Sequence, residues 1–214
     1  MRLAVRMYIT ITILMTATVI LAVMQVAACA ATDDRKENDM KGMGKVLVVF
    51  FSRTGENYAV GYIEKGNTDI VAEMIAARTG GDLFRIEPER PYPDNYRECI
   101  EAAGHELETG ARPTIKGDIR VEDYDVVFVG YPNWWGDMPM PVYTFIEKHC
   151  WNGITVVPFC THEGCGLGST ATRLAAACSG AVMLDGLAVR GDTAQNSRKQ
   201  AQKVVDGWLE KLGY

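Results

Sequence analysis

The sequence lacks an excess of basic residues. It has 22 Lys and Arg against 27 Asp and Glu, and its formal net charge is −5. Nucleic-acid binding needs a basic surface, so this charge argues against nucleic acid as the main partner. The chain also lacks the composition of a disordered, collagen-like or polytopic membrane protein, because 48% of its 214 residues are apolar and 23% are charged. That length is enough for one α/β domain, or two small ones, with a substantial core.

Several common site motifs are also missing. No Walker motif ending in Gly-Lys-Ser/Thr is present, which argues against ATP or GTP as the ligand. No Gly-x-Ser-x-Gly nucleophile elbow is present, which argues against a serine hydrolase. Cys160, His162 and Cys165 are residue types that bind zinc, but a closed zinc site needs four ligands. We therefore expect no metal.

Acidic residues are absent from the first 28 positions, which contain Arg2, Arg6 and 21 apolar residues. A basic start followed by a long apolar stretch is typical of an export signal. The stretch ends in Val26-Ala27-Ala28-Cys29, which resembles the lipobox of bacterial lipoproteins. The resemblance implies that residues 1–28 are a signal peptide and that Cys29 is lipidated, anchoring the chain to a membrane.

The alternative is an uncleaved transmembrane anchor with Cys29 at its end, because about 20 apolar residues span a bilayer. The basic residues at positions 2 and 6 favour a cytoplasmic N-terminus in either case. Both interpretations place the rest of the chain outside the cytoplasm, in a bacterial cell envelope. Residues 29–44 are polar and charged and read as a flexible tether, and without the signal the chain has a net charge of −7.

From residue 45 onward, apolar strand patterns alternate with helical ones. The expected strands cover residues 46–51, 82–87, 124–130, 154–159 and 181–189, and the expected helices cover 68–78, 95–108, 141–149, 169–178 and 194–212. This alternation predicts an α/β fold with a doubly wound parallel sheet and helices on both faces. Ligands of such sheets bind beyond the carboxyl ends of the strands, so we expect the site in the loops that follow strands one, three and four.

The first of these loops contains Ser52-Arg53-Thr54-Gly55, and Gly66-Asn67-Thr68 leads into the first helix after an insertion. Hydroxyl and amide groups at a helix N-terminus bind anions. Without residues 56–66 the run reads Ser-Arg-Thr-Gly-Asn-Thr, which resembles the FMN phosphate loop of flavodoxins. The resemblance implies that Ser52, Arg53, Thr54, Gly55 and Asn67 bind the phosphate. The insertion leaves open whether Asn57 or Thr68 makes the last contact, and we favour Thr68 because it begins the helix. Tyr58 and Tyr62 of the insertion either cover the site or pack the loop down.

The flavodoxin resemblance extends over residues 45–214. It implies a five-stranded parallel sheet of order 2-1-3-4-5 and one non-covalently bound FMN.

The second loop contains Pro132-Asn133-Trp134-Trp135-Gly136. Two adjacent Trp residues in a Gly- and Pro-rich loop are hard to explain as core, because loops lie on the surface. In flavodoxin-like proteins this loop packs against the flavin ring. The resemblance implies that one Trp stacks on the ring while the other packs beneath it, and the sequence does not distinguish them.

The third loop contains Cys160-Thr161-His162, followed by Gly164, Gly166 and Gly168 at alternate positions. Glycines let a backbone approach a ligand closely. By resemblance, amides of this loop bind the pyrimidine edge of the flavin and tune its reduction potential. Two questions stay open here. Cys160 and Cys165 either form a disulfide or stay free, and His162 either transfers protons or hydrogen-bonds a neighbouring backbone group.

The resemblance implies an FMN-binding electron-transfer protein of the cell envelope, with a redox protein or a quinone-like small molecule as its partner. One alternative is an enzyme that uses bound FMN to oxidise NAD(P)H and reduce quinones or flavins. No separate nicotinamide-binding motif supports that alternative, and nicotinamide nucleotides are scarce outside the cytoplasm. The other alternative is an FMN-binding envelope protein without turnover.

Overall fold

The computed structural model describes residues 44–214. The predicted signal peptide, Cys29 and almost all of the predicted tether lie outside the described residues. Among the described residues, no helix is both long enough and apolar enough to cross a bilayer.

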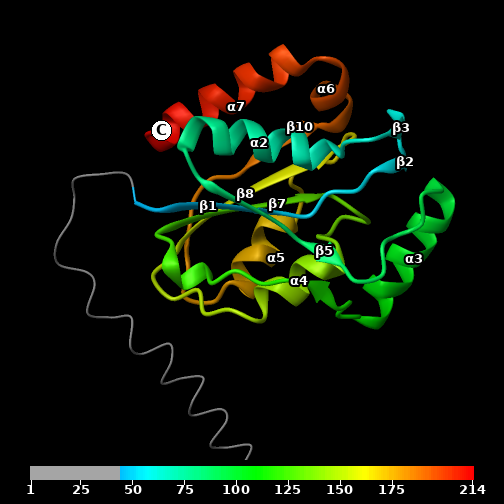
Figure 1. Cartoon of the computed structure of the whole chain (residues 1–214), viewed down its shortest axis with the longest axis horizontal. Coiled ribbons are helices and arrows are strands. Elements are labelled where there is room, and N and C mark those ends of the chain that lie inside the picture. Colours follow the sequence, from blue (N-terminus) through cyan, green and yellow to red (C-terminus); the bar gives the residue numbers. More distant parts are fainter. Residues whose placement is uncertain (1–43) are drawn as a thin grey trace, which may run out of the picture. The chain divides into compact units, whose positions relative to one another are not determined.

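A parallel sheet forms the centre of the described region (Figure 1). Its main strands are β1 (Val46–Phe50), β4 (Asp82–Arg85), β7 (Val126–Pro132), β8 (Thr155–His162) and β10 (Leu187–Arg190), in the spatial order β10-β8-β7-β1-β4. The short β9 (Val182–Met183) also pairs with β8. In chain order this is 2-1-3-4-5, so the predicted fold class and strand order are confirmed.

The continuous apolar runs of the sequence become strands buried on both faces. All five residues of β1 are buried, and successive side chains point to opposite sides of the sheet. Leu47 and Val49 belong to one apolar cluster, whereas Val46 and Val48 belong to another. Gly130 in β7 permits this packing, because an added Cβ would clash with the ring of Phe159 on β8.

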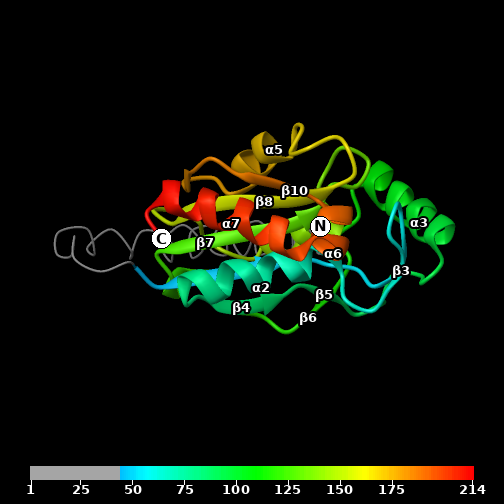
Figure 2. The same ribbon diagram turned by 90° about the horizontal axis from the view of Figure 1, so that it is seen from above.

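Helices cover both faces of the sheet. α2 (Asn67–Thr79), α6 (Gly191–Asn196) and α7 (Arg198–Leu212) lie along one face, as Figure 2 shows. α4 (Met140–Ile146) and α5 (Thr170–Ala177) lie on the other, and α3 (Tyr96–Thr109) extends from one end of the sheet.

The insertion folds into an antiparallel hairpin of β2 (Gly55–Asn57) and β3 (Gly61–Ile63). The sequence pattern predicts no strand in this segment. This hairpin, residues 55–63, stands beside α3 at the end of the sheet where β1, β7 and β8 terminate.

Most predicted elements are found with shifted ends, such as the strand expected at 154–159, which runs to His162; three others are divided or broken. The strand expected at 82–87 ends at Arg85, and Glu87–Pro88 (β5) instead pairs with Ile115–Lys116 (β6) in a separate two-stranded sheet. The strand expected at 181–189 is interrupted at residues 184–186, giving β9 and β10. The helix expected at 194–212 breaks at Ser197, where the backbone leaves the helical conformation with φ −136° and ψ 51°.

Candidate functional site

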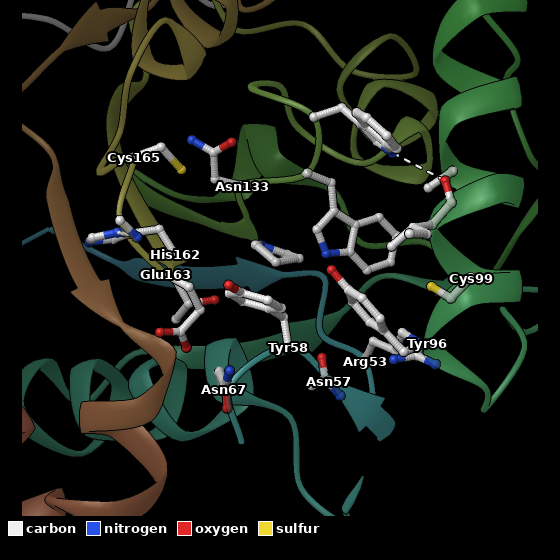
Figure 3. A pocket seen from close by; sticks show the side chains of 17 residues that line it. Arg53, Asn57, Tyr58, Asn67, Tyr96, Cys99, Asn133, His162, Glu163 and Cys165 are labelled. Atoms are coloured by element: carbon white, nitrogen blue, oxygen red, sulfur yellow. Dashed lines mark hydrogen bonds between the residues drawn. The ribbon is translucent and has the colours of Figure 1, made fainter. Parts of the chain in front are cut away.

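A cavity of about 410 Å³ opens at the carboxyl ends of β1, β7 and β8 (Figure 3). It lies where doubly wound sheets bind their ligands. The structure brings residues of all three predicted loops to its walls. The predicted residues that line it are Arg53, Asn57, Asn67, Pro132, Asn133, Trp134, Trp135, Thr161, His162 and Gly164.

Other predicted site residues do not line this cavity. They are Ser52, Thr54, Gly55, Thr68, Gly136, Cys160, Gly166 and Gly168. Thr54 and Ser52 line a second cavity of about 220 Å³, together with Arg85 and Lys116. Several residues outside the main cavity still position those that line it.

The start of α2 is held close to the loop after β1. The Asp69 N–H donates to Ser52 Oγ at 3.1 Å. An added Cβ on Gly66 would clash with Ser52 Oγ and would lie 2.6 Å from the carbonyl oxygen of Arg53, so only glycine permits this approach. Gly66 is the N-cap of α2 and makes no side-chain cap, so the helix N-terminus retains amide groups for an outside acceptor.

The Thr68 hydroxyl bonds another buried hydroxyl. It lies 2.8 Å from the hydroxyl of Thr161, and both residues are buried. Thr68 therefore joins α2 to the end of β8 with its side chain, and only one of the two hydroxyls donates its hydrogen in this bond.

Arg53 has a structural role that the sequence did not reveal. Its guanidinium donates to the carbonyl oxygens of Glu56 and Pro93, and to that of Asp94 at 2.7 Å. The side chain is buried and ties the hairpin to the segment before α3. Arg53 lines the cavity, but these guanidinium N–H groups are already paired with backbone oxygens.

The two Trp residues of the second loop are in different environments. Trp134 is half-buried and packs edge-to-face on Phe51 and Tyr92, with ring centroids 5.4 and 5.1 Å away. Trp135 is 63% exposed, and its Nε1–H donates to the Ile100 carbonyl at 3.1 Å. Trp134 is thus the Trp anchored in the protein, and Trp135 lies at the surface against α3.

Trp135 also has an unusual backbone conformation. Its φ is 54° and that of Gly136 is 76°, within a turn closed by two hydrogen bonds between Trp134 and Asp137. A positive φ is an outlier for a bulky residue and occurs most often at functional sites.

Neighbouring side chains hold the third loop in place. The Gly164 N–H donates to Nδ1 of His162 at 2.9 Å, the backbone interaction weighed above as the alternative to proton transfer. Burial lowers the pKa of His162 below its usual value, so the ring is neutral at pH 7. Asn133 Nδ2 donates to the Gly166 carbonyl at 2.9 Å, which joins the second loop to the third.

Cys160 and Cys165 are both free thiols, so the disulfide considered above is absent. The buried Cys160 thiol donates to the Gly166 carbonyl at 3.3 Å, and burial raises its pKa to about 12. Cys165 is exposed and lines the cavity. Among the described residues, no group of three His, Cys, Asp or Glu side chains is arranged to hold a metal ion.

Glu163 is an acidic residue that lines the cavity. Its Oε1 accepts the Asp192 N–H at 2.8 Å, and Oε2 lies 3.5 Å from Arg190. The carboxylate is therefore held by the start of α6 and partly balanced by one cation.

Some lining residues were not predicted as site residues. They are Tyr58, Tyr96, Cys99, Ile100, Ala103, Glu163 and Cys165. Four of these belong to α3, whose apolar positions look like ordinary core positions in sequence. Glu163 and Cys165 lie in the third loop, so they could have been predicted by including every residue of that loop in the site.

Comparison with known proteins gives a consistent result. A family model described as flavodoxin matches residues 45–211. No curated protein matches the chain significantly. Among solved structures, a flavoprotein from Bacteroides eggerthii is 32% identical, with a TM-score of 0.63 over 80% of this chain and 99% of that one.

Two further structures are more distant. A flavoprotein from Bacteroides uniformis is 24% identical, with a TM-score of 0.61 over 77% of this chain and 99% of that one. A flavoprotein from Lactobacillus acidophilus, solved in complex with FMN, is 20% identical, with a TM-score of 0.54 over 72% of this chain and 97% of that one. At these identities, the two structures support the fold.

Proposed function

Because the chain belongs to the flavodoxin family, we propose that it is an FMN-binding electron-transfer protein of the cell envelope. FMN is its cofactor, as expected for the family and as found in the Lactobacillus acidophilus complex. One observation carries the proposal. A single cavity combines the start of α2 at Asn67 with aromatic walls, at the carboxyl end of the sheet.

The residues present fit this cofactor. The cavity volume of about 410 Å³ lies within the usual range for small-molecule sites. Asn67 Oδ1 and Asn133 Oδ1 are buried and accept no hydrogen bond within the described structure, and both residues line the cavity. A buried acceptor without a partner is costly, so these oxygens call for a ligand that brings donors. FMN has hydroxyl groups along its ribityl chain and an N–H on its ring.

The start of α2 supports phosphate binding. Ser52 accepts from Asp69, and Gly66 brings the loop within contact of the helix. Backbone amides and the helix dipole favour an anion there. Asn67 and Asn57 line the cavity and Thr68 does not, so we assign Thr68 an amide contact and leave side-chain contacts to Asn67 and Asn57.

Trp134 is the better candidate to stack on the ring. Edge-to-face packing on Phe51 and Tyr92 fixes its orientation, and it lines the cavity. Bound FMN supplies one- or two-electron transfer, and the protein's part is to hold, orient and shield it. The acidic balance of residues 29–214, net −7, would steer a basic redox protein toward the site.

The envelope location rests on the lipobox at Val26–Cys29. Metabolic labelling with radioactive palmitate tests it. We expect label on the wild type and none on Cys29→Ala, and label that survives the substitution would refute lipidation at this residue.

Flavin titration tests the redox function. The full chain, purified in detergent and freed of flavin, is titrated with FMN while flavin fluorescence is followed, and NADH and a quinone are then added. We expect FMN uptake without NADH oxidation. NADH-dependent quinone reduction would favour the oxidoreductase, whereas absence of FMN uptake would end both redox proposals.

A further inference from the structure

The third loop brings the imidazole of His162 to the cavity but no Phe, Tyr or Trp side chain. Its lining residues are Thr161 to Cys165, and Trp134 of the second loop forms one aromatic wall. A flat ring is held best between two aromatic faces. Trp135 of the second loop is held against α3 by its bond to Ile100, whereas Tyr58 and Tyr96 line the cavity from outside these two loops.

We propose that Tyr58, on the β2–β3 hairpin, is the opposite wall and covers the outer face of the bound flavin ring. The inference rests on the proposed function, since it assumes FMN in this cavity. Tyr58 lines the cavity although 63% of its surface is exposed. Figure 3 shows its ring extending from the hairpin, with Tyr96 on one side and Glu163 on the other.

The base of the hairpin is firmly anchored. The Glu56 N–H donates to the Asp94 carbonyl at 2.9 Å, and Arg53 donates to the same oxygen at 2.7 Å. The Glu56 carboxylate accepts from Asn95 Nδ2 at 3.0 Å and from the Tyr96 N–H at 3.1 Å, at the start of α3. The hairpin is thus fixed to α3 at its base, which limits where its tip can point.

The tip presents Tyr58 toward Tyr96. The two ring centroids lie 6.1 Å apart, with planes tilted by 31°. Ala59, the next residue, has a φ of 65°, a left-handed conformation that non-glycine residues rarely adopt. Such strain persists where the surrounding structure imposes it, often at a ligand clamp.

Covering the ring has a consequence for access. With Trp134 and Tyr58 on its two faces, the flavin would be reached only at its edge. A nicotinamide that must stack on the flavin would be excluded, which favours an electron carrier over an NAD(P)H-dependent reductase.

The test compares Tyr58→Ala with Tyr62→Ala as the matched control. Tyr62 lies on the same hairpin and is 68% exposed, but it does not line the cavity. Dissociation constants for FMN and riboflavin are measured by fluorescence, and circular dichroism in the flavin bands reports the environment of the ring. Far-UV circular dichroism confirms that each variant folds.

We expect Tyr58→Ala to weaken binding of both ligands by about tenfold, because stacking acts on the ring that they share. Tyr58→Phe retains binding to within roughly twofold, and Tyr62→Ala binds like the wild type. Equal effects of Tyr58→Ala and Tyr62→Ala, or no effect of either, would overturn the inference. A loss seen with Tyr96→Ala and not with Tyr58→Ala would assign the wall to α3 instead.

The two proposals fail in different ways. If the wild type takes up no FMN, the proposed function falls and this inference with it. If the wild type binds FMN and Tyr58→Ala binds it equally well, only the inference falls.

Discussion

The hydroxyl of Thr68 lies 2.8 Å from the hydroxyl of Thr161, which joins the first turn of α2 to the end of β8. The two residues are 93 positions apart in the chain, and both are buried. This contact links two of the three loops around the cavity, so the phosphate end and the third loop are held as one structure.

Replacing one of these hydroxyls leaves the other buried without its partner. We expect Thr68→Val and Thr161→Val each to lower the free energy of unfolding by about 1–2 kcal/mol. The double variant should lose less than the sum, because two apolar groups of matching shape leave no unsatisfied hydroxyl. Urea denaturation of the flavin-free protein measures all three. Additive losses would show that the two hydroxyls do not interact.

Replacing Gly66 and Gly207 by alanine should affect the protein in opposite ways. At Gly66, an added Cβ would clash with Ser52 Oγ, so Gly66→Ala separates the loop from α2 and weakens FMN binding. At Gly207, inside α7, an added Cβ meets no atom within 4 Å. Gly207→Ala should therefore stabilise the protein by about 0.5–1 kcal/mol and leave FMN affinity unchanged. Thermal unfolding measures the stability of each variant, and flavin titration measures its FMN affinity. If Gly66→Ala binds FMN like the wild type, close contact between the loop after β1 and α2 is not needed for binding.

Because the thiol of Cys178 is buried, the folded protein should lose stability as the pH rises into the alkaline range. Burial raises its pKa from 9.0 to about 12. Between these values the unfolded chain loses the proton and the folded one keeps it, so stability is complete below pH 9 and falls as the pH rises above it. The contribution is at most about 1.4 kcal/mol per pH unit.

Cys178→Ala should remove that part of the slope. Urea denaturation from pH 7 to 10.5 tests this, and the difference between variant and wild type should stay constant below pH 8.5 and then shrink. A constant difference over the whole range would contradict the prediction.

Cys165 offers a probe of the cavity. It is exposed and lines the cavity, whereas Cys99, Cys160 and Cys178 are buried. Iodoacetamide should modify Cys165 faster than these three thiols, and saturating FMN should slow that reaction, because a bound ligand covers the loop. Peptide mapping by mass spectrometry identifies the site, and Cys165→Ser is the control. Modification at the same rate with and without FMN would place the ligand elsewhere.

The central sheet could be predicted because its signal is local. Each residue of Val46–Phe50 is apolar and each is buried, so the run itself records a strand covered on both faces. The loops after strands one, three and four could be located because the fold class places ligands at the carboxyl ends of strands.

The rest depended on contacts between distant segments. Arg53 looks like a phosphate ligand in sequence, but backbone oxygens of residues 93–95 accept from its Nη2 group, and its buried Nε–H has no partner among the described residues. The hairpin has only three residues in each strand, and its position depends on Glu56 and Asp94. Cys99 and Ala103 have the helical spacing of core residues, and only the placement of α3 brings them to the cavity.

Gly55 pairs with Ile63, so the two ends of the hairpin lie side by side. Its chain leaves the loop after β1 and returns beside its starting point, so the core strands on either side need not move to accommodate it. Residues 56–62 could therefore be exchanged for a shorter loop or for another hairpin without redesigning the sheet. New ligand preferences could then arise by replacing this one segment, while the remainder of the domain continued to fold as before.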